Sequence, residues 1–155
     1  MERWLNRMTE EKVTLKIINW LKNNKWIILS FDFPQSGTGH IFHPGEQTNN
    51  KLNSFIPDII AVKDNTSIFI ENKNRYVLSD FVKQNELKNN IEKYNSVNEF
   101  LADYNIKNIY FGIGMPLYSY RNHKDSNTDL VDFILGVEDN NLTVIFNQAN
   151  INFLN

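Results

Sequence analysis

The first regular pattern in the chain is helical and begins after Thr9. Apolar residues recur there three or four positions apart, which is the spacing of one face of an α-helix. Thr9 suits the N-cap, and Glu10 and Glu11 fall in the first turn, where the helix dipole favours acids. The pattern predicts a helix that ends near Asn23, with an inner face of Val13, Ile17, Trp20 and Leu21.

Shorter apolar segments farther along favour β-strands, because they are rich in Ile, Val and Phe and are bounded by turn residues. Two of them flank the polar residues 64–66 and predict a hairpin. Another is almost continuously apolar, as expected of a strand buried on both faces. The expected strands are Trp26–Phe33 (ended by Pro34), Ile56–Lys63, Ser67–Lys73, Ile109–Met115, Val131–Glu138 and Leu142–Phe146.

Between the third and fourth strands, the spacing of apolar residues predicts a helix over Asp80–Tyr94 and a shorter one over Val97–Tyr104. Residues 35–54 lose all periodicity and predict a long loop, and a second loop is expected over residues 118–124. The order of elements predicts an α/β fold with a mixed central sheet flanked by helices and a C-terminal β-hairpin. We expect one domain over residues 1–155.

Composition narrows the classes of protein. The chain has no Cys, which excludes disulfides and Cys-based zinc sites. No apolar run approaches the roughly 20 residues that span a membrane, and the first residues lack a signal-peptide pattern, so we expect a cytoplasmic protein. The net charge of −2 disfavours a general charge-driven nucleic-acid binder. Five cations nevertheless gather in one stretch: Lys73, Arg75, Lys83, Lys88 and Lys93.

The hairpin brings charged residues together, in a way that depends on its turn. If residues 64 and 65 are the central turn residues, Asp58 lies opposite Glu71, and if 65 and 66 are central, it lies opposite Lys73. Glu71 and Lys73 share a face in either case. A three-residue loop without a bulge would pair Asp58 with Asn72 and break the arrangement.

Two carboxylates at the ends of buried strands are costly unless they are paired or bind a metal. A divalent cation relieves their repulsion, and oxygen-only ligands suit Mg²⁺, with Mn²⁺ as a substitute. Such a cation would polarise a phosphoryl oxygen, and Lys73 would hold or help deprotonate the attacking water or stabilise negative charge in the transition state. The alternative is a structural salt bridge between Lys73 and the acids.

The segment Ile56-Pro57-Asp58, followed after twelve residues by Glu71-Asn72-Lys73, resembles the PD-(D/E)xK nuclease signature. That superfamily includes restriction endonucleases, Holliday-junction resolvases and repair nucleases. The expected elements from Thr9 to Met115 also resemble its restriction endonuclease-like αβββαβ core.

The resemblance implies a role for each matching residue. Asp58, Glu71 and the main-chain carbonyl of Asn72 would be metal ligands, and Lys73 would be the catalytic lysine. Many members also carry an acid on the first helix, for which we favour Glu11 over Glu10, although either acid also fits a helix-dipole role.

The function implied is a Mg²⁺-dependent endodeoxyribonuclease, of a restriction type or from a mobile element. It would act as a homodimer or with a larger specificity subunit, and it would not contact a membrane. A Holliday-junction resolvase or repair nuclease is the enzyme alternative. A nuclease-fold module that binds nucleic acid or protein without catalysis is the alternative of a different class.

Candidate contacts to nucleic acid lie on loops and on the helix after the motif. A solvated surface is the alternative for each, and the histidines at 40 and 43 lack a third ligand for zinc. The candidates are Thr38, His40, Arg75, Lys83, Gln84 and Arg121.

Overall fold

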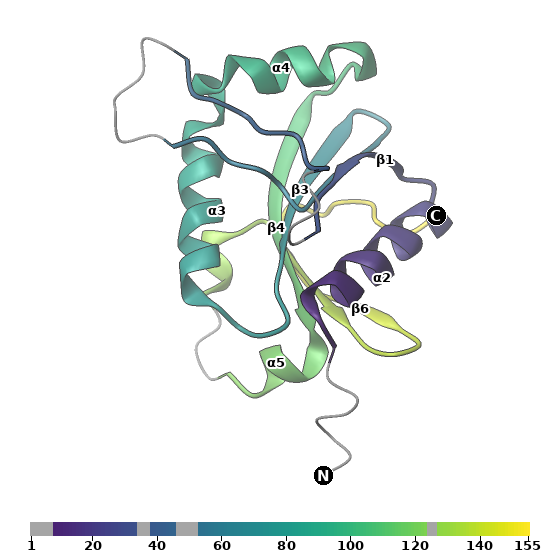
Figure 1. The fold of residues 1–155 in the computed structure, drawn as a ribbon. Coiled ribbons are helices and arrows are strands. Elements are labelled where there is room, and N and C mark those ends of the chain that lie inside the picture. The colour runs from purple at the N-terminus through teal and green to yellow at the C-terminus, as the bar shows by residue number, and fades with distance from the viewer. Residues whose placement is uncertain (1–7, 34–37, 46–52, 124–126) are drawn as a thin grey trace.

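The computed structural model describes residues 8–33, 38–45, 53–123 and 127–155, so the expected strand end at Pro34 and the last residue of the loop over 118–124 lie outside the described residues. A six-stranded sheet runs through these ranges in the order β1-β2-β3-β4-β5-β6 (Figure 1). The strands are β1 (Ile27–Phe31), β2 (Ile59–Lys63), β3 (Thr66–Asn72), β4 (Asn108–Pro116), β5 (Phe133–Val137) and β6 (Leu142–Asn147).

The sheet is mixed. The β1–β2, β2–β3 and β5–β6 pairs are antiparallel, whereas β3–β4 and β4–β5 are parallel. The long connection from β3 to β4 is helical, as is usual for a crossover between parallel strands. The helices are α2 (Glu10–Asn23), α3 (Leu78–Asn90), α4 (Asn95–Leu101) and α5 (Leu117–Arg121), with short 3₁₀ segments η1 (Ile91–Lys93), η2 (Ala102–Tyr104) and η3 (Thr128–Leu130).

Helices cover both faces of the sheet, with α2 on one side and α3 and α4 on the other (Figure 1). On the α2 side, Val13 and Ile17 pack against Ile68 and Ile70 of β3. On the other side, Leu87 packs in a second cluster with the ring of Phe69. Successive residues of β3 therefore face different helices, and this alternation decides which side chains reach the candidate site.

The predicted α/β class, the mixed sheet flanked by helices and the C-terminal hairpin are confirmed. Several element bounds differ by a few residues from the expectation, and two of the differences are described here. Asp58 lies just before β2 rather than inside it, and the loop expected from residue 118 begins with the helix α5. Pro116 ends β4 and serves as the N-cap of α5, where Leu117 is buried, and five residues are too short for a recognisable helical period.

Part of the expected long loop belongs to the core. Phe42 forms an isolated antiparallel bridge with Phe55, and its side chain is wholly buried among other aromatic rings. No helix in the described ranges is long and apolar enough to cross a membrane.

Candidate active site

The turn between β2 and β3 places the acids of the candidate site. Lys63 pairs with Thr66 and Ile59 pairs with Ile70, so residues 64 and 65 are the central turn residues. Asp64 adopts a positive φ of 53°, a conformation that Asp tolerates better than most residues. This is the first of the turns left open by the sequence. The regular ladder ends at Ile59 and Ile70, and the Asp58 N–H donates to the Ile70 carbonyl at 3.0 Å, so the expected direct pairing of Asp58 with Glu71 is not formed. Asp58 nevertheless lies near enough to Glu71 to raise its pKa.

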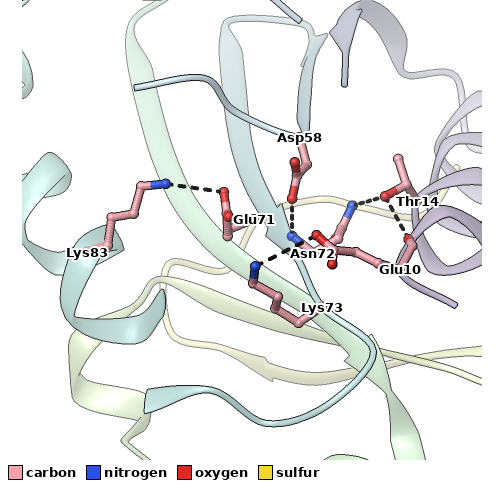
Figure 2. A network of polar contacts seen from close by, with 7 residues as sticks. All are labelled: Glu10, Thr14, Asp58, Glu71, Asn72, Lys73 and Lys83. Carbon is pink, nitrogen blue, oxygen red and sulfur yellow. Dashed lines mark hydrogen bonds and ion pairs between the residues drawn. The ribbon is translucent and has the colours of Figure 1, made fainter. Parts of the chain in front are cut away.

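Asp58 is held by the main chain of the neighbouring strand. The Asn72 N–H donates to Asp58 Oδ2 at 2.7 Å (Figure 2). The pKa of Asp58 is raised to about 6, mainly by burial and in part by the charges of Glu10 and Asp32, whereas the Asn72 N–H and Lys73 oppose the shift. Asp32 is adjacent because its own N–H donates to the Asp58 carbonyl at 2.9 Å.

Glu71 is the more perturbed of the two acids. Only 9% of the residue is exposed, and burial together with the charge of Asp58 raises the pKa of Glu71 to about 8. Lys83 of α3 opposes this shift, but its Nζ lies 3.8 Å from Glu71 Oε2, a long ion pair with an exposed cation. Within the described part of the chain, the pair of carboxylates is therefore short of counter-charge at neutral pH.

Lys73 follows β3 directly, and its N–H donates to the Gly114 carbonyl at 3.0 Å. Burial lowers the pKa of Lys73, but the summed attraction of Asp80, Glu10, Glu71 and Asp58 outweighs that effect, so the pKa lies above the ordinary value. Lys73 therefore carries an ammonium group, which donates hydrogen bonds and cannot accept a proton.

The acid that α2 contributes is Glu10. Its Oε1 lies 3.8 Å from Lys73 Nζ, and its charge acts on Asp58 (Figure 2). Glu11 is exposed and is not among the charges that shift the pKa of Asp58, Glu71 or Lys73. The preference for Glu11 over Glu10 is corrected, because one residue along a helix rotates a side chain by about 100°.

Asp80 is a site residue that the sequence did not reveal. It lies in the first turn of α3, is 8% exposed, and its Oδ2 has no hydrogen-bond partner within the described ranges. Burial raises the pKa of Asp80, and Lys73, Lys83 and Arg75 oppose the shift. An acid in a first helical turn has an ordinary explanation in the helix dipole, so only its burial marks it.

The residues expected to contact nucleic acid lie in four different places. Lys83 and Arg75 lie beside the acids, as their electrostatic effects on Glu71 and Asp80 show. Arg121 is exposed at the end of α5, which Ser119 ties to the Asn74 carbonyl at 3.3 Å.

Thr38 and His40 lie on the β1 side of the site. Thr38 donates to the Phe31 carbonyl at 3.0 Å, and the His40 ring packs against Phe42 and Phe100 with centroid distances of 4.6 and 4.5 Å. Both residues are exposed.

Gln84 does not face a ligand. It is 3% exposed, and its Nε2 donates to the Phe69 carbonyl at 3.2 Å and to the Gly112 carbonyl at 2.8 Å. Both amide hydrogens are thus directed at the main chains of β3 and β4. The expectation that Gln84 contacts nucleic acid is therefore corrected, because its side chain is buried and bonded to the main chain.

The donor set fits Mg²⁺ better than a metal that needs a closed protein cage. No group of three or more His, Asp or Glu side chains converges as a metal site among the described residues. Asp58 and Glu71 would supply two carboxylates, and the Asn72 carbonyl would supply a third oxygen. Mg²⁺ characteristically binds through one or two carboxylates and fills its remaining positions with water and substrate phosphate.

Comparisons with protein-family models, curated proteins and solved structures found no significant match to this chain. The resemblance to the PD-(D/E)xK superfamily therefore remains a prediction from the residues of the chain.

Proposed function

We propose that the chain is a Mg²⁺-dependent endodeoxyribonuclease that hydrolyses phosphodiester bonds. One observation carries the proposal. Asp58, just before β2, and Glu71, near the end of β3, lie close enough to interact electrostatically, with pKa values raised to about 6 and about 8. Such a pair is stabilised by a divalent cation, and Lys73 adds a positive charge beside it.

The arrangement of the elements supports a restriction endonuclease-like core of the PD-(D/E)xK kind. The order α2, β1, β2, β3, α3, β4 agrees with an αβββαβ core, and β3 pairs in parallel with β4. The acids and the lysine lie at the end of the central hairpin, as the resemblance implies. We propose membership of that superfamily on these grounds.

In the proposed reaction, Asp58, Glu71 and the Asn72 carbonyl would hold the cation. The cation, when bound, supplies the positive charge that polarises the scissile phosphate. Lys73 donates hydrogen bonds from its ammonium group to the attacking water or to a phosphate oxygen, and it stabilises the negative charge of the transition state. The Asn72 N–H keeps Asp58 oriented toward the same point.

The cations around the acids would contact the phosphates on either side of the cleaved bond. Arg75 is exposed, and 43% of the Lys83 side chain is accessible, so both can reach a ligand. Contacts of this kind position a strand without reading its sequence. Cutting both strands needs two active sites, so we propose that the chain acts as a homodimer or with a partner subunit.

A panel of substrates tests the proposal and separates its variants. Supercoiled plasmid, single-stranded DNA, branched DNA and RNA are each incubated with the protein in Mg²⁺ or in EDTA. We expect Mg²⁺-dependent cleavage of at least one DNA, loss of that cleavage in Asp58→Ala, and little effect of Glu11→Ala, the exposed neighbour of Glu10. Preference for branched DNA would indicate a resolvase or repair enzyme instead of a restriction-type enzyme.

The result that would overturn the proposal is equally definite. If none of the substrates is cut in Mg²⁺ or Mn²⁺, and wild type and Asp58→Ala behave alike, the chain is a binding module and not a nuclease.

A further inference from the structure

Asn72 stands at a position where packing alone would favour an apolar residue. Alternation along β3 turns its side chain toward α2, the face on which Ile68 and Ile70 contact the core. Asn72 is nevertheless fully buried there, with 0% exposure. An amide in such a place is costly unless it makes hydrogen bonds, so its contacts decide what it contributes.

The Asn72 side chain reaches the first turns of α2 through Thr14. Its Nδ2 donates to Thr14 Oγ1 at 3.1 Å, and the Thr14 hydroxyl in turn donates to the Glu10 carbonyl at 3.1 Å (Figure 2). Thr14 is 1% exposed, so water does not compete for these bonds. Because the hydroxyl has one hydrogen, its donation to Glu10 leaves an acceptor directed at Asn72.

The oxygen of the Asn72 amide, unlike its nitrogen, makes no hydrogen bond to a described residue. This oxygen, Asn72 Oδ1, is buried. It lies so close to Gly114 that a Cβ built on that glycine would be 2.2 Å away. The amide therefore makes one directional bond, to Thr14, at the cost of an unsatisfied oxygen.

The main chain of Asn72 completes the connection, since its N–H holds Asp58 at 2.7 Å. One residue thus contacts an acid of the site through its backbone and α2 through its side chain. Glu10, at the start of α2, lies 3.8 Å from Lys73. We infer that Asn72 and Thr14 are positioning residues, whose hydrogen bond sets α2 against β3 so that Glu10 is held beside Lys73.

The consequence of this arrangement for cleavage rests on the proposed function, but the arrangement itself is tested without any cleavage. A zero-length carbodiimide reagent joins a lysine to a carboxylate that it already contacts, and mass spectrometry measures the yield. Two pairs have the same 3.8 Å separation, Glu10 with Lys73 and Glu71 with Lys83, so the second is an internal reference for the first. Glu10→Gln identifies the first crosslink against the neighbouring Glu11.

The informative variants are Thr14→Val, which keeps the shape and removes the hydroxyl, and Thr14→Ser, which keeps the hydroxyl. We expect the yield of the Glu10–Lys73 crosslink, relative to Glu71–Lys83, to fall about three- to tenfold in Thr14→Val, the factor that corresponds to one lost hydrogen bond. Thr14→Ser should match wild type. Asn72→Leu removes the same bond from the other side and should reproduce the loss.

An unchanged ratio in folded Thr14→Val and Asn72→Leu would overturn the inference.

Cleavage supplies a second measurement, which a merely structural role of Thr14 would leave unchanged. Thr14→Val should slow single-turnover cleavage in the wild-type and Glu11→Gln backgrounds, yet add nothing to the effect of Glu10→Gln, and independent effects would contradict the inference. A protein that cuts no substrate would refute the proposed function and leave the crosslinking result decisive for the positioning role.

Discussion

At the scale of single residues, the candidate site is a group of acids with few ionic partners among the described residues. Glu71 and Asp80 are both nearly buried, and the ion pair that Glu71 does make is long, at 3.8 Å. Long pairs with exposed cations contribute little to stability. The charges are therefore better explained as groups that act on a ligand than as salt bridges that hold the fold together.

Lys73 provides the clearest residue-scale prediction. Lys73→Ala should reduce cleavage by at least about 100-fold, because it removes a positive charge from the transition state. Binding of Mn²⁺, measured by calorimetry, should stay close to wild type, since an ammonium group is not a metal ligand. Lys12→Ala, which changes an exposed lysine on α2, serves as the control. Loss of folding in Lys73→Ala would instead favour a structural salt bridge.

At the scale of elements, the two faces of β3 contribute different residues to the candidate site. Glu71 faces α3, whose Lys83 approaches it, while Asn72 faces α2 and contacts Thr14. The parallel neighbour β4 contacts both Asn72 and Lys73. Gly114 pairs with Asn72, and its carbonyl accepts a hydrogen bond from the Lys73 N–H. Small changes in β4 should therefore displace Asn72 and Lys73 and so disturb the site.

Gly114→Ala tests this role of β4. The new methyl group would lie 2.2 Å from Asn72 Oδ1 and 2.4 Å from Ile17 Cδ1, so the strand or α2 must shift. We predict a loss of about 1–3 kcal/mol in the free energy of unfolding, the usual cost of overpacking a core. Gly45→Ala is the control, because its nearest atom would be 3.4 Å away. Equal denaturation midpoints for the two variants would contradict the prediction.

The helix α3 presents Asp80 to the same end of β3. Gln84 contacts the Phe69 carbonyl, and one helical turn from Gln84 to Asp80 covers about 6 Å, the rise of about two strand residues. Asp80 therefore lies near the level of Glu71, just before Lys73.

Asp80 contributes the largest carboxylate effect on the pKa of Lys73, and that effect raises it. Asp80→Asn should therefore lower the pKa of Lys73, as measured by NMR of the lysine side chain. Glu86→Gln, an exposed change on the same helix, should leave it unaltered. An unshifted Lys73 in Asp80→Asn would show that the buried acid acts elsewhere.

At the scale of the whole molecule, the burial and mutual repulsion of the acids should make the stability of the fold depend on pH. Folding raises the pKa of Asp58 from 3.8 to about 6 and that of Glu71 from 4.5 to about 8. The folded state therefore holds protons that the unfolded state has released. In EDTA, the stability that these protons confer is complete below about pH 4 and is lost as the pH rises to about 8.

We expect the loss to be on the order of a few kcal/mol, measured by denaturant unfolding at several pH values. Glu71→Gln should flatten the dependence, because it removes the most perturbed group. Mg²⁺ should restore stability to the wild type at pH 8, since binding to the folded state shifts the equilibrium, and it should not do so in Asp58→Asn. A metal-free protein that gains stability between pH 4 and pH 8 would contradict this reading of the acids.

The sequence alone was sufficient for local features. Periodicity identified α2 and the strands, and residue spacing placed Asp58, Glu71 and Lys73 on one hairpin. These features depend on neighbours a few positions apart, which a sequence displays directly. The spacing also restricted the hairpin to a few registers, although it could not choose among them.

Only the tertiary structure decided the rest, because the decisive contacts join residues far apart in the chain. It selected residues 64 and 65 as the central turn residues, replaced Glu11 with Glu10, buried Gln84 of α3 against β3 and β4 and brought Asp80 to the site. The rotation of α2 and the placement of α3 on the sheet follow from the packing of whole faces. A charge in a first helical turn looks the same in sequence whether it faces solvent or a half-buried lysine, and packing alone distinguishes the two.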